Sequence, residues 1–183
     1  VQTKLKLGFR KPGLLQSALT HRSYKREGQD HYERLEFLGD AVLDLVVSEW
    51  LMVRHPKVDE GFLSRMRAEL VNRSTLAELA EYLELETHVR LGQSEPFQDH
   101  RSRKSILGDV FEAIVGAYYL DSGFDACRTW VSQVYDDFVK TTFNPNRVRD
   151  YKSSLQEWTQ SRGFELPLYS LAGFDGPDHL KVF

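Results

Sequence analysis

Three acidic residues stand in an otherwise almost wholly apolar stretch between residues 33 and 43. Glu33, Glu36 and Asp40 are spaced at i, i+3 and i+7, which places them on one face of an α-helix. Leucine, valine, alanine and phenylalanine fill most of the other positions, so the helix is expected to be buried on nearly every side. Because ionised carboxylates are costly in such surroundings unless cations neutralise them, the stretch predicts a metal-binding helix.

A second apolar helix is predicted between residues 106 and 117, with Asp109 and Glu112 on one face. Two acidic stripes that face each other form an all-oxygen cage, which suits hard cations such as Mg²⁺. The chain has one cysteine and six scattered histidines, so no pattern of zinc ligands competes with this interpretation. Asp44, which continues the first stripe, is interpreted as an ordinary solvated or salt-bridged residue.

The rest of the chain up to residue 145 has the apolar spacing of helices and predicts an all-α domain, with proline and glycine between the segments. The expected helices span Leu14–Ser23, Tyr32–Arg54, Phe62–Leu70, Ser74–Leu83, Ser105–Leu120 and Phe124–Phe143. Residues 93–103 are expected to form an exposed loop. Pro145, with an asparagine on either side, is expected to end the last helix and to begin a short polar linker.

The pattern changes after this linker. A short amphipathic helix is predicted over residues 150–160 and a strand over residues 167–172. Residues 173–179 are expected to form a turn, and residues 180–183 to begin another strand. This part of the chain therefore differs in kind from the helical part that precedes it.

Composition limits the classes of protein to which this chain can belong. The single cysteine, Cys127, excludes an internal disulfide and is interpreted as a packing residue. Neither a signal-like leader nor an apolar run of membrane length is visible, so the cytoplasm is the expected compartment and no membrane partner is expected.

The formal net charge of -3 is unusual for a nucleic-acid-binding protein. Acids that hold metal ions would leave the outer surface less negative than this sum, and three local basic groups remain. They are Lys4, Lys6, Arg10 and Lys11; Arg65, Arg67 and Arg73; and His100, Arg101, Arg103 and Lys104. Any one such group is ordinarily a solvated surface, and only their convergence on one groove would favour RNA binding.

Several motifs resemble those of the ribonuclease III family. Residues 33–43, with the sequence ERLEFLGDAVL, resemble the family signature, and residues 105–113, with the sequence SILGDVFEA, resemble its second acidic motif. Residues 14–23, 58–61 and 64–68 resemble further family segments. The matches follow the family's order along essentially the whole chain.

This resemblance implies roles for individual acids. The residues that match the family's Mg²⁺ ligands at the scissile phosphate are Glu36, Asp40, Asp109 and Glu112. Asp40 and Glu112 match the positions on which catalysis depends most, and Mn²⁺ is a candidate substitute for Mg²⁺. Glu33 and Glu60 match two outer acids that assist with a second metal, water or product release. Gly108 departs from the alanine most often found there, a change that is expected to be tolerated.

The implied activity is hydrolysis of double-stranded RNA to leave a 5′ phosphate, a 3′ hydroxyl and short 3′ overhangs, as in the processing of ribosomal and messenger RNA precursors. Metal ions can supply the activated water and stabilise both reacting oxygens, so no serine or cysteine nucleophile is required. The family also forms homodimers. Phe37 matches the residue that enters a pocket of the partner subunit, although an ordinary core phenylalanine is the alternative.

The last part of the chain resembles the first half of a double-stranded RNA-binding domain. The implied organisation is an endonuclease domain over residues 1–145, a linker over residues 146–150 and a partial α+β RNA-binding domain over residues 151–183. Its third strand and final basic helix are absent from this sequence, so weak RNA binding is expected. The residues that match RNA contacts are Ser153, Gln156, Gln160, Pro177, Asp178 and His179.

Three interpretations of different classes remain open at this point. The first is a Mg²⁺-dependent endoribonuclease of double-stranded RNA. The second is a protein of the same fold that binds double-stranded RNA without cleaving it. The third is a structural helical protein whose acids pair with Arg34, Arg65 and Arg67.

Overall fold

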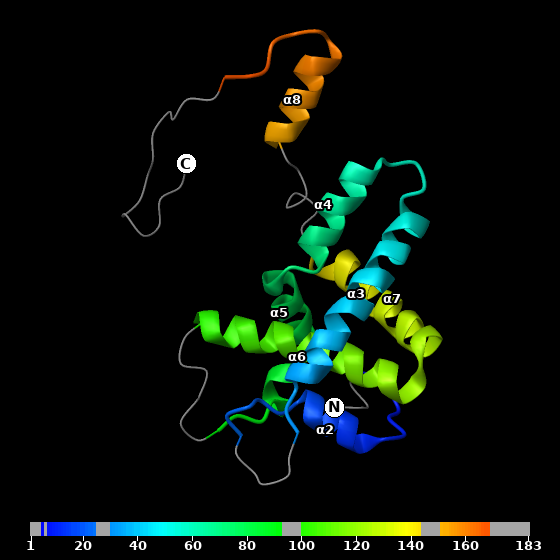
Figure 1. The fold of residues 1–183 in the computed structure, drawn as a ribbon, viewed down its shortest axis with the longest axis vertical. Helices are drawn as coiled ribbons and strands as arrows, with labels where there is room; N and C mark the ends of the chain where they lie inside the picture. Colours follow the sequence, from blue (N-terminus) through cyan, green and yellow to red (C-terminus); the bar gives the residue numbers. More distant parts are fainter. Residues whose placement is uncertain (1–4, 6, 25–29, 93–99, 144–150, 169–183) are drawn as a thin grey trace. The chain divides into compact units, whose positions relative to one another are not determined.

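The computed structural model describes residue 5 and residues 7–24, 30–92, 100–143 and 151–168 (Figure 1). The chain divides into two compact units, residues 1–147 and residues 148–183. Within the described residues, helices make up the regular structure, and an isolated parallel bridge joins Thr20 to Arg90. The prediction of an all-α nuclease domain is therefore confirmed for the described part of the first unit.

Six α-helices and a short 3₁₀ helix are described in the first unit. They are α2 (Pro12–Ala18), α3 (Glu33–Arg54), α4 (Glu60–Leu70), α5 (Arg73–Tyr82), η1 (Leu85–His88), α6 (His100–Ser122) and α7 (Phe124–Thr141). Helices α3 and α6 make the most extensive contact in this unit, and α5 packs against α6 (Figure 1). The two predicted acidic helices are thus the central pair of the fold.

Two glycines allow α3 and α6 to cross with their backbones in contact. A Cβ atom on Gly39 would overlap the carbonyl oxygen of Glu112, and a Cβ atom on Gly116 would overlap the carbonyl oxygen of Leu35. Only glycine avoids such overlap, so these positions hold the two helix axes close together. Because Gly39 lies three residues after Glu36 and opposite Glu112, the crossing brings acidic residues of both helices side by side.

The hydrophobic core lies around this helix pair. Phe111, Tyr135 and Phe138 are among the largest fully buried side chains, and the Tyr135 hydroxyl donates to the carbonyl oxygen of Leu70 at 3.1 Å. Cys127 is also buried, and burial raises the pKa of its thiol to about 12. This thiol therefore packs in the core, as the sequence predicts, and remains protonated at neutral pH.

Helix α2 is shorter than predicted, because it ends at Ala18 rather than at Ser23. The amide of His21 donates to the carbonyl oxygen of Arg90 at 3.0 Å, and the amide of Arg90 donates to the carbonyl oxygen of Leu19 at 2.8 Å. These backbone bonds to a distant segment replace the helical bonds that residues 19–23 would otherwise make. The amide of Tyr32 also donates to the carbonyl oxygen of Thr20 at 3.0 Å, which holds the segment after α2 beside the start of α3.

Helix α6 begins earlier than predicted. It starts at His100, so the prediction of an exposed loop over residues 93–103 is wrong for residues 100–103, and residues 93–99 lie outside the described part. Arg103 explains the longer helix, because its guanidinium pairs with Glu81 at 3.3 Å and with Glu86 at 2.6 Å. These ion pairs hold the first turn of α6 against α5 and η1.

The second unit contains helix α8 (Tyr151–Ser161), close to the predicted span of 150–160. The rings of Trp158 and Phe164 stack with centroids 6.0 Å apart, and the Arg162 guanidinium lies 4.4 Å from the Trp158 centroid. Residues 164–168 follow the helix without forming a strand, although a strand is predicted from residue 167. The rest of the predicted strands and turn, and the linker over residues 146–150, lie outside the described residues.

Across the described ranges, none of the helices combines the length and the apolar composition needed to cross a bilayer.

Candidate active site

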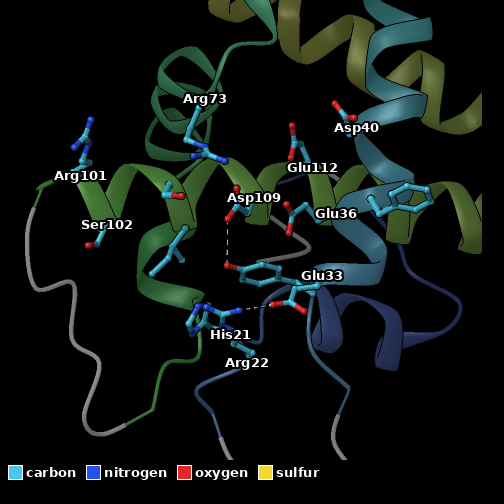
Figure 2. Close-up of a pocket in the computed structure, with 14 residues that line it drawn as sticks. His21, Arg22, Glu33, Glu36, Asp40, Arg73, Arg101, Ser102, Asp109 and Glu112 are labelled. Atoms are coloured by element: carbon cyan, nitrogen blue, oxygen red, sulfur yellow. Dashed lines mark hydrogen bonds and ion pairs between the residues drawn. The ribbon is translucent and has the colours of Figure 1, made fainter.

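A cavity of about 1150 Å³ opens where α3 crosses α6 (Figure 2). It is lined by the segment after α2, the start of α3, the first residue of α5 and one face of α6. The five acids of the two predicted helical stripes all line it, namely Glu33, Glu36, Asp40, Asp109 and Glu112. The two stripes therefore face each other, as predicted.

Three of these acids form one tight group. Glu36, Asp109 and Glu112 each offer a carboxylate oxygen, and these oxygens lie within 4.8 Å of one another. Figure 2 shows the three side chains pointing toward a common space, one from α3 and two from α6. All three are half-buried. Such a set of oxygen ligands fits a hard divalent cation.

Asp40 lies at the edge of this group. It lines the same cavity, but it is exposed and is not among the three acids whose oxygens are mutually within 4.8 Å. Its charge nevertheless reaches the group, because after burial it is the strongest influence that raises the pKa of Glu112. The four predicted ligands therefore share one cavity, with Asp40 at its rim.

The crowding of carboxylates raises their pKa values. Burial, followed by the charges of Asp109 and Glu33, raises the pKa of Glu36 to about 7. Burial, followed by the charges of Asp40 and Asp109, raises the pKa of Glu112 to about 8. Burial also raises the pKa of Asp109 above its ordinary value. Like charges gathered in a half-buried site are unfavourable by themselves, so the arrangement favours a bound cation.

Tyr32 and His21 support the cavity from the side of the segment after α2. The Tyr32 hydroxyl donates to a carboxylate oxygen of Asp109 at 3.5 Å. The Tyr32 ring packs against the His21 ring, with centroids 5.6 Å apart. Burial and the neighbouring acids raise the pKa of Tyr32, so its hydroxyl keeps its proton at neutral pH. This contact helps to orient the Asp109 carboxylate.

The two predicted auxiliary acids lie in different places. Glu33 lines the cavity and forms an ion pair with Arg22 at 3.4 Å. Glu60 begins α4 and accepts a hydrogen bond from Ser64 at 2.6 Å, outside the cavity. Helix α4 meets the C-terminal end of α3, where the rings of Phe62 and His55 lie 6.0 Å apart, whereas Glu36 lies near the other end of α3. Within one chain the two auxiliary acids are therefore separated.

The predicted basic groups are divided by the fold. Arg73 and Arg101 line the cavity, whereas Arg103 pairs with acids of α5 and η1. Arg67, on α4, donates to the hydroxyl of Ser48 on α3 at 3.0 Å and does not line the cavity. Arg73 from the second predicted basic group and Arg101 from the third thus lie at the cavity, together with Arg22.

Three contributors to this site were not predicted from the sequence: Gly39, Gly116 and Tyr32. The glycines carry a recognisable signal, because a glycine inside an otherwise buried helix indicates close backbone packing. Tyr32 carries none, because it reaches the acids through tertiary contacts alone. Arg73 was predicted only as one member of a basic group, and its place beside the acids depends on tertiary structure.

Comparison with known proteins agrees with this site. The ribonuclease-III-like family model matches residues 11–137. A protein named Ribonuclease 3 from Oleidesulfovibrio alaskensis is 49% identical over 173 residues, which cover 93% of this chain and 76% of that protein. Another Ribonuclease 3, from Wolinella succinogenes, is 44% identical over 182 residues, covering 100% of this chain and 76% of the relative.

The fold is also similar to that of a solved ribonuclease III structure. The nuclease domain of ribonuclease III from Campylobacter jejuni superposes with a TM-score of 0.69 at 40% identity, covering 74% of this chain and 94% of that domain. The chain belongs to the ribonuclease III family. It is an enzyme of that family, an endoribonuclease that acts on double-stranded RNA and processes RNA precursors.

Proposed function

We propose that this enzyme hydrolyses its RNA phosphodiesters at the cavity between α3 and α6, with Mg²⁺ held by the acidic side chains there. The observation that carries the proposal is the group of Glu36, Asp109 and Glu112, whose oxygens lie within 4.8 Å of one another. Among the described residues, no lysine or arginine forms an ion pair with any of the three. An acidic group of this kind is costly unless a cation occupies it.

The donor set fits the proposed metal. All the groups are carboxylates, which favour Mg²⁺ and also accept Mn²⁺ as a substitute. Glu36, Asp109 and Glu112 would hold the ion, and Asp40 would complete the set from the rim of the cavity. When bound, divalent ions supply an activated water and neutralise the charge that builds on the phosphoryl oxygens.

The chain's own residues place the acidic side chains in two ways. The glycine-based crossing of α3 and α6 fixes the positions of the carboxylates before RNA arrives. Tyr32 orients Asp109 through its hydroxyl. Asp40 and Glu112 are the two acids on which we expect cleavage to depend most, and the products are expected to carry 5′ phosphates, 3′ hydroxyls and short 3′ overhangs.

A cleavage assay tests this proposal. The chain is incubated with labelled duplex RNA, with and without Mg²⁺, beside the variants Asp40→Asn and Glu112→Gln. Each substitution keeps the shape of the side chain and removes its charge, so both variants should fold and lose cleavage. Asp44→Asn is the matched control, because Asp44 lies on α3 outside the cavity. Cleavage without any divalent ion, or full activity of Glu112→Gln, would contradict the proposal.

We also propose that two copies pair through the outer face of α3. Phe37 is 82% exposed, Leu45 57% and Met52 63%, and helical periodicity places all three within one stripe of about 80°. An exposed apolar stripe of this kind indicates a protein interface. Phe37 also lines the acidic cavity, so the proposed interface lies next to the site.

Sedimentation tests this dimer. Phe37→Glu and Leu45→Glu should yield monomers, because each places a charge within the buried interface. Leu120→Glu is the control, since Leu120 is 47% exposed near the end of α6 and outside the stripe. Persistence of the dimer in both test variants would contradict this interface.

The remaining roles concern the outer acids and the second unit. We propose that Glu33 and Glu60 are auxiliary acids that assist with a second metal, water or product release; Glu33 lines the acidic cavity, which supports this role for it. We further propose a nuclease domain over residues 1–145, a linker over 146–150 and a partial RNA-binding domain over 151–183. The division of the chain near residue 147 supports this organisation.

Contacts with RNA in the second unit are proposed for six residues. Ser153, Gln156 and Gln160 lie on α8, where Gln160 is exposed and Gln156 is half-buried. Pro177, Asp178 and His179 fall outside the described residues. The relatives that match most of the chain are bacterial, which supports a cytoplasmic location and ribosomal and messenger RNA precursors as substrates.

A further inference from the structure

Arg73 places a positive charge beside the acidic group. It is the first residue of α5 and lines the main cavity. It also lines a smaller cavity of about 260 Å³, together with Glu36, Asp109 and Glu112. Figure 2 shows its side chain extending from α5 toward Asp109 and Glu112.

The backbone of Arg73 is held firmly in this place. Asn72 caps α5 by accepting a hydrogen bond from the amide of Thr75 at 2.9 Å, and its side-chain amide donates to the carbonyl oxygen of Glu69 at 3.0 Å. A Cβ atom on Gly108 would lie only 3.3 Å from the carbonyl oxygen of Arg73. The glycine that precedes Asp109 therefore lets the start of α5 approach α6 closely.

The guanidinium of Arg73 is not committed to a structural ion pair. Other arginines of this unit are: Arg103 pairs with Glu86 at 2.6 Å, and Arg128 pairs with Glu49 at 3.0 Å. Within the ranges that the structure describes, Arg73 forms no ion pair. Its charge still acts on the site, because it opposes the rise in the pKa of Glu36, Asp109 and Glu112.

These observations describe a cation that faces the acids and keeps its hydrogen-bond donors available. We propose that Arg73 binds the RNA phosphate that enters this cavity, by donating from its guanidinium to the non-bridging oxygens. The planar fork of arginine matches two phosphate oxygens at once, and Arg73 is exposed, so RNA can reach its guanidinium. The inference rests on the proposed function, because it requires RNA to reach the acidic cavity.

The competing explanation is a counter-ion. In that case Arg73 only reduces the repulsion between the acids, and a bound divalent cation makes it dispensable. The two roles differ in their salt dependence. Each arginine or lysine that contacts a phosphate adds about one to the slope of log affinity against log salt concentration, whereas a counter-ion of protein carboxylates adds nothing.

The experiment measures binding apart from cleavage. Affinity for a fluorescent RNA duplex is measured in Mg²⁺ at several salt concentrations, with Glu112→Gln as the background that is expected to stop cleavage. Arg73→Gln and Arg73→Lys are added to this background. Lys140→Gln is the control, because Lys140 is an exposed cation on α7 outside the acidic cavity. Circular dichroism confirms that each variant folds.

The expected results follow from the charge and the planar shape of the arginine guanidinium. Arg73→Gln should weaken binding by roughly tenfold near 0.1 M salt and reduce the salt slope by about one for each site engaged. Arg73→Lys should keep most of the slope, because it keeps the charge, while binding less tightly than arginine. Lys140→Gln should leave the slope unchanged.

A second readout uses Mg²⁺ alone. The Mg²⁺ concentration that raises the melting temperature halfway should fall in Arg73→Gln, since a competing cation is removed. If that shift occurs while RNA affinity and its salt slope stay unchanged, Arg73 is a counter-ion and the proposal is overturned. Failure of the proposed function is distinguishable, because Glu112→Gln would then still cleave RNA.

Discussion

The charged side chains near the two ends of helix α3 are arranged in opposite ways. Toward its C-terminus, Arg54 pairs with Asp136, which also accepts a hydrogen bond from the indole of Trp50 at 3.2 Å. Toward its N-terminus, Glu36 faces Asp109 and Glu112, with their oxygens within 4.8 Å. One end stabilises the fold with matched charges, and the other gathers like charges.

This difference shows where the chain sacrifices stability for function. Matched pairs such as Arg54 with Asp136 need no further partner. The acidic group at the other end remains unfavourable until a cation arrives, and raised pKa values of Glu36 and Glu112 are the sign of that cost. Sites that break the ordinary rules of packing in this way are usually functional.

The largest expected effect comes from neutralising one acid near each end of α3, Glu112 beside its N-terminus and Asp136 beside its C-terminus. Glu112→Gln should reduce cleavage by several orders of magnitude, while the metal-free protein becomes more stable because repulsion is relieved. Asp136→Asn should leave cleavage intact and cost about 1 kcal/mol of unfolding free energy, since it weakens a partly exposed pair. Cleavage rates and melting temperatures of both variants check this contrast. Loss of stability in metal-free Glu112→Gln would break it.

The next largest effect concerns the crossing that creates the acidic group. Gly39→Ala adds a methyl group that overlaps the Glu112 backbone, so α3 and α6 must separate. We expect a loss of about 1–3 kcal/mol in unfolding free energy, together with reduced cleavage. Gly13→Ala is the control, because no atom lies within 4 Å of its added Cβ and it should be neutral or slightly stabilising. Equal stability and activity of the two variants would refute the role of the crossing.

A smaller effect is expected from Tyr32→Phe. Removing the hydroxyl that donates to Asp109 should lower the apparent Mg²⁺ affinity by about tenfold without unfolding the protein. The Mg²⁺ dependence of the melting temperature measures this change. Tyr82→Phe serves as the control, since Tyr82 is 42% exposed and lies outside the acidic cavity. An unchanged Mg²⁺ midpoint would show that Asp109 needs no such support.

The smallest effect is a dependence of stability on pH. Glu36 and Glu112 have pKa values near 7 and 8 in the folded metal-free protein, above their ordinary value of 4.5. The folded state therefore binds more protons than the unfolded state between about pH 5 and pH 8, so stability should fall as pH rises through this window. Melting temperatures in chelator measure it, and Glu112→Gln should flatten the decline. A rise in stability over the same range would contradict the assignment.

Helical periodicity was sufficient to predict the acidic group, but not all of its surroundings. The i, i+3 spacing of Asp109 and Glu112, and the stripe that contains Glu36, follow from sequence because helix geometry is regular. The end of α2 at Ala18 could not be predicted, because a backbone partner at Arg90 decides it. Long-range hydrogen bonds of this kind leave no local pattern.

Charge clustering along the chain was a poorer guide. Arg65, Arg67 and Arg73 are neighbours in sequence, yet Arg73 alone lines the acidic cavity, because a capped helix begins at that residue. Similarly, Glu60 resembles an auxiliary acid by motif but begins α4 and does not line the cavity that Glu36 lines. The family resemblance identified the acids, whereas the tertiary fold determined which cations accompany them.

The most direct test of the account is an anomalous difference map from crystals of this chain grown with Mn²⁺. We expect a peak about 2–2.5 Å from carboxylate oxygens of Glu36, Asp109 and Glu112, in the cavity between α3 and α6. A cavity that stays empty at saturating Mn²⁺, or an ion bound only by other residues, would contradict it.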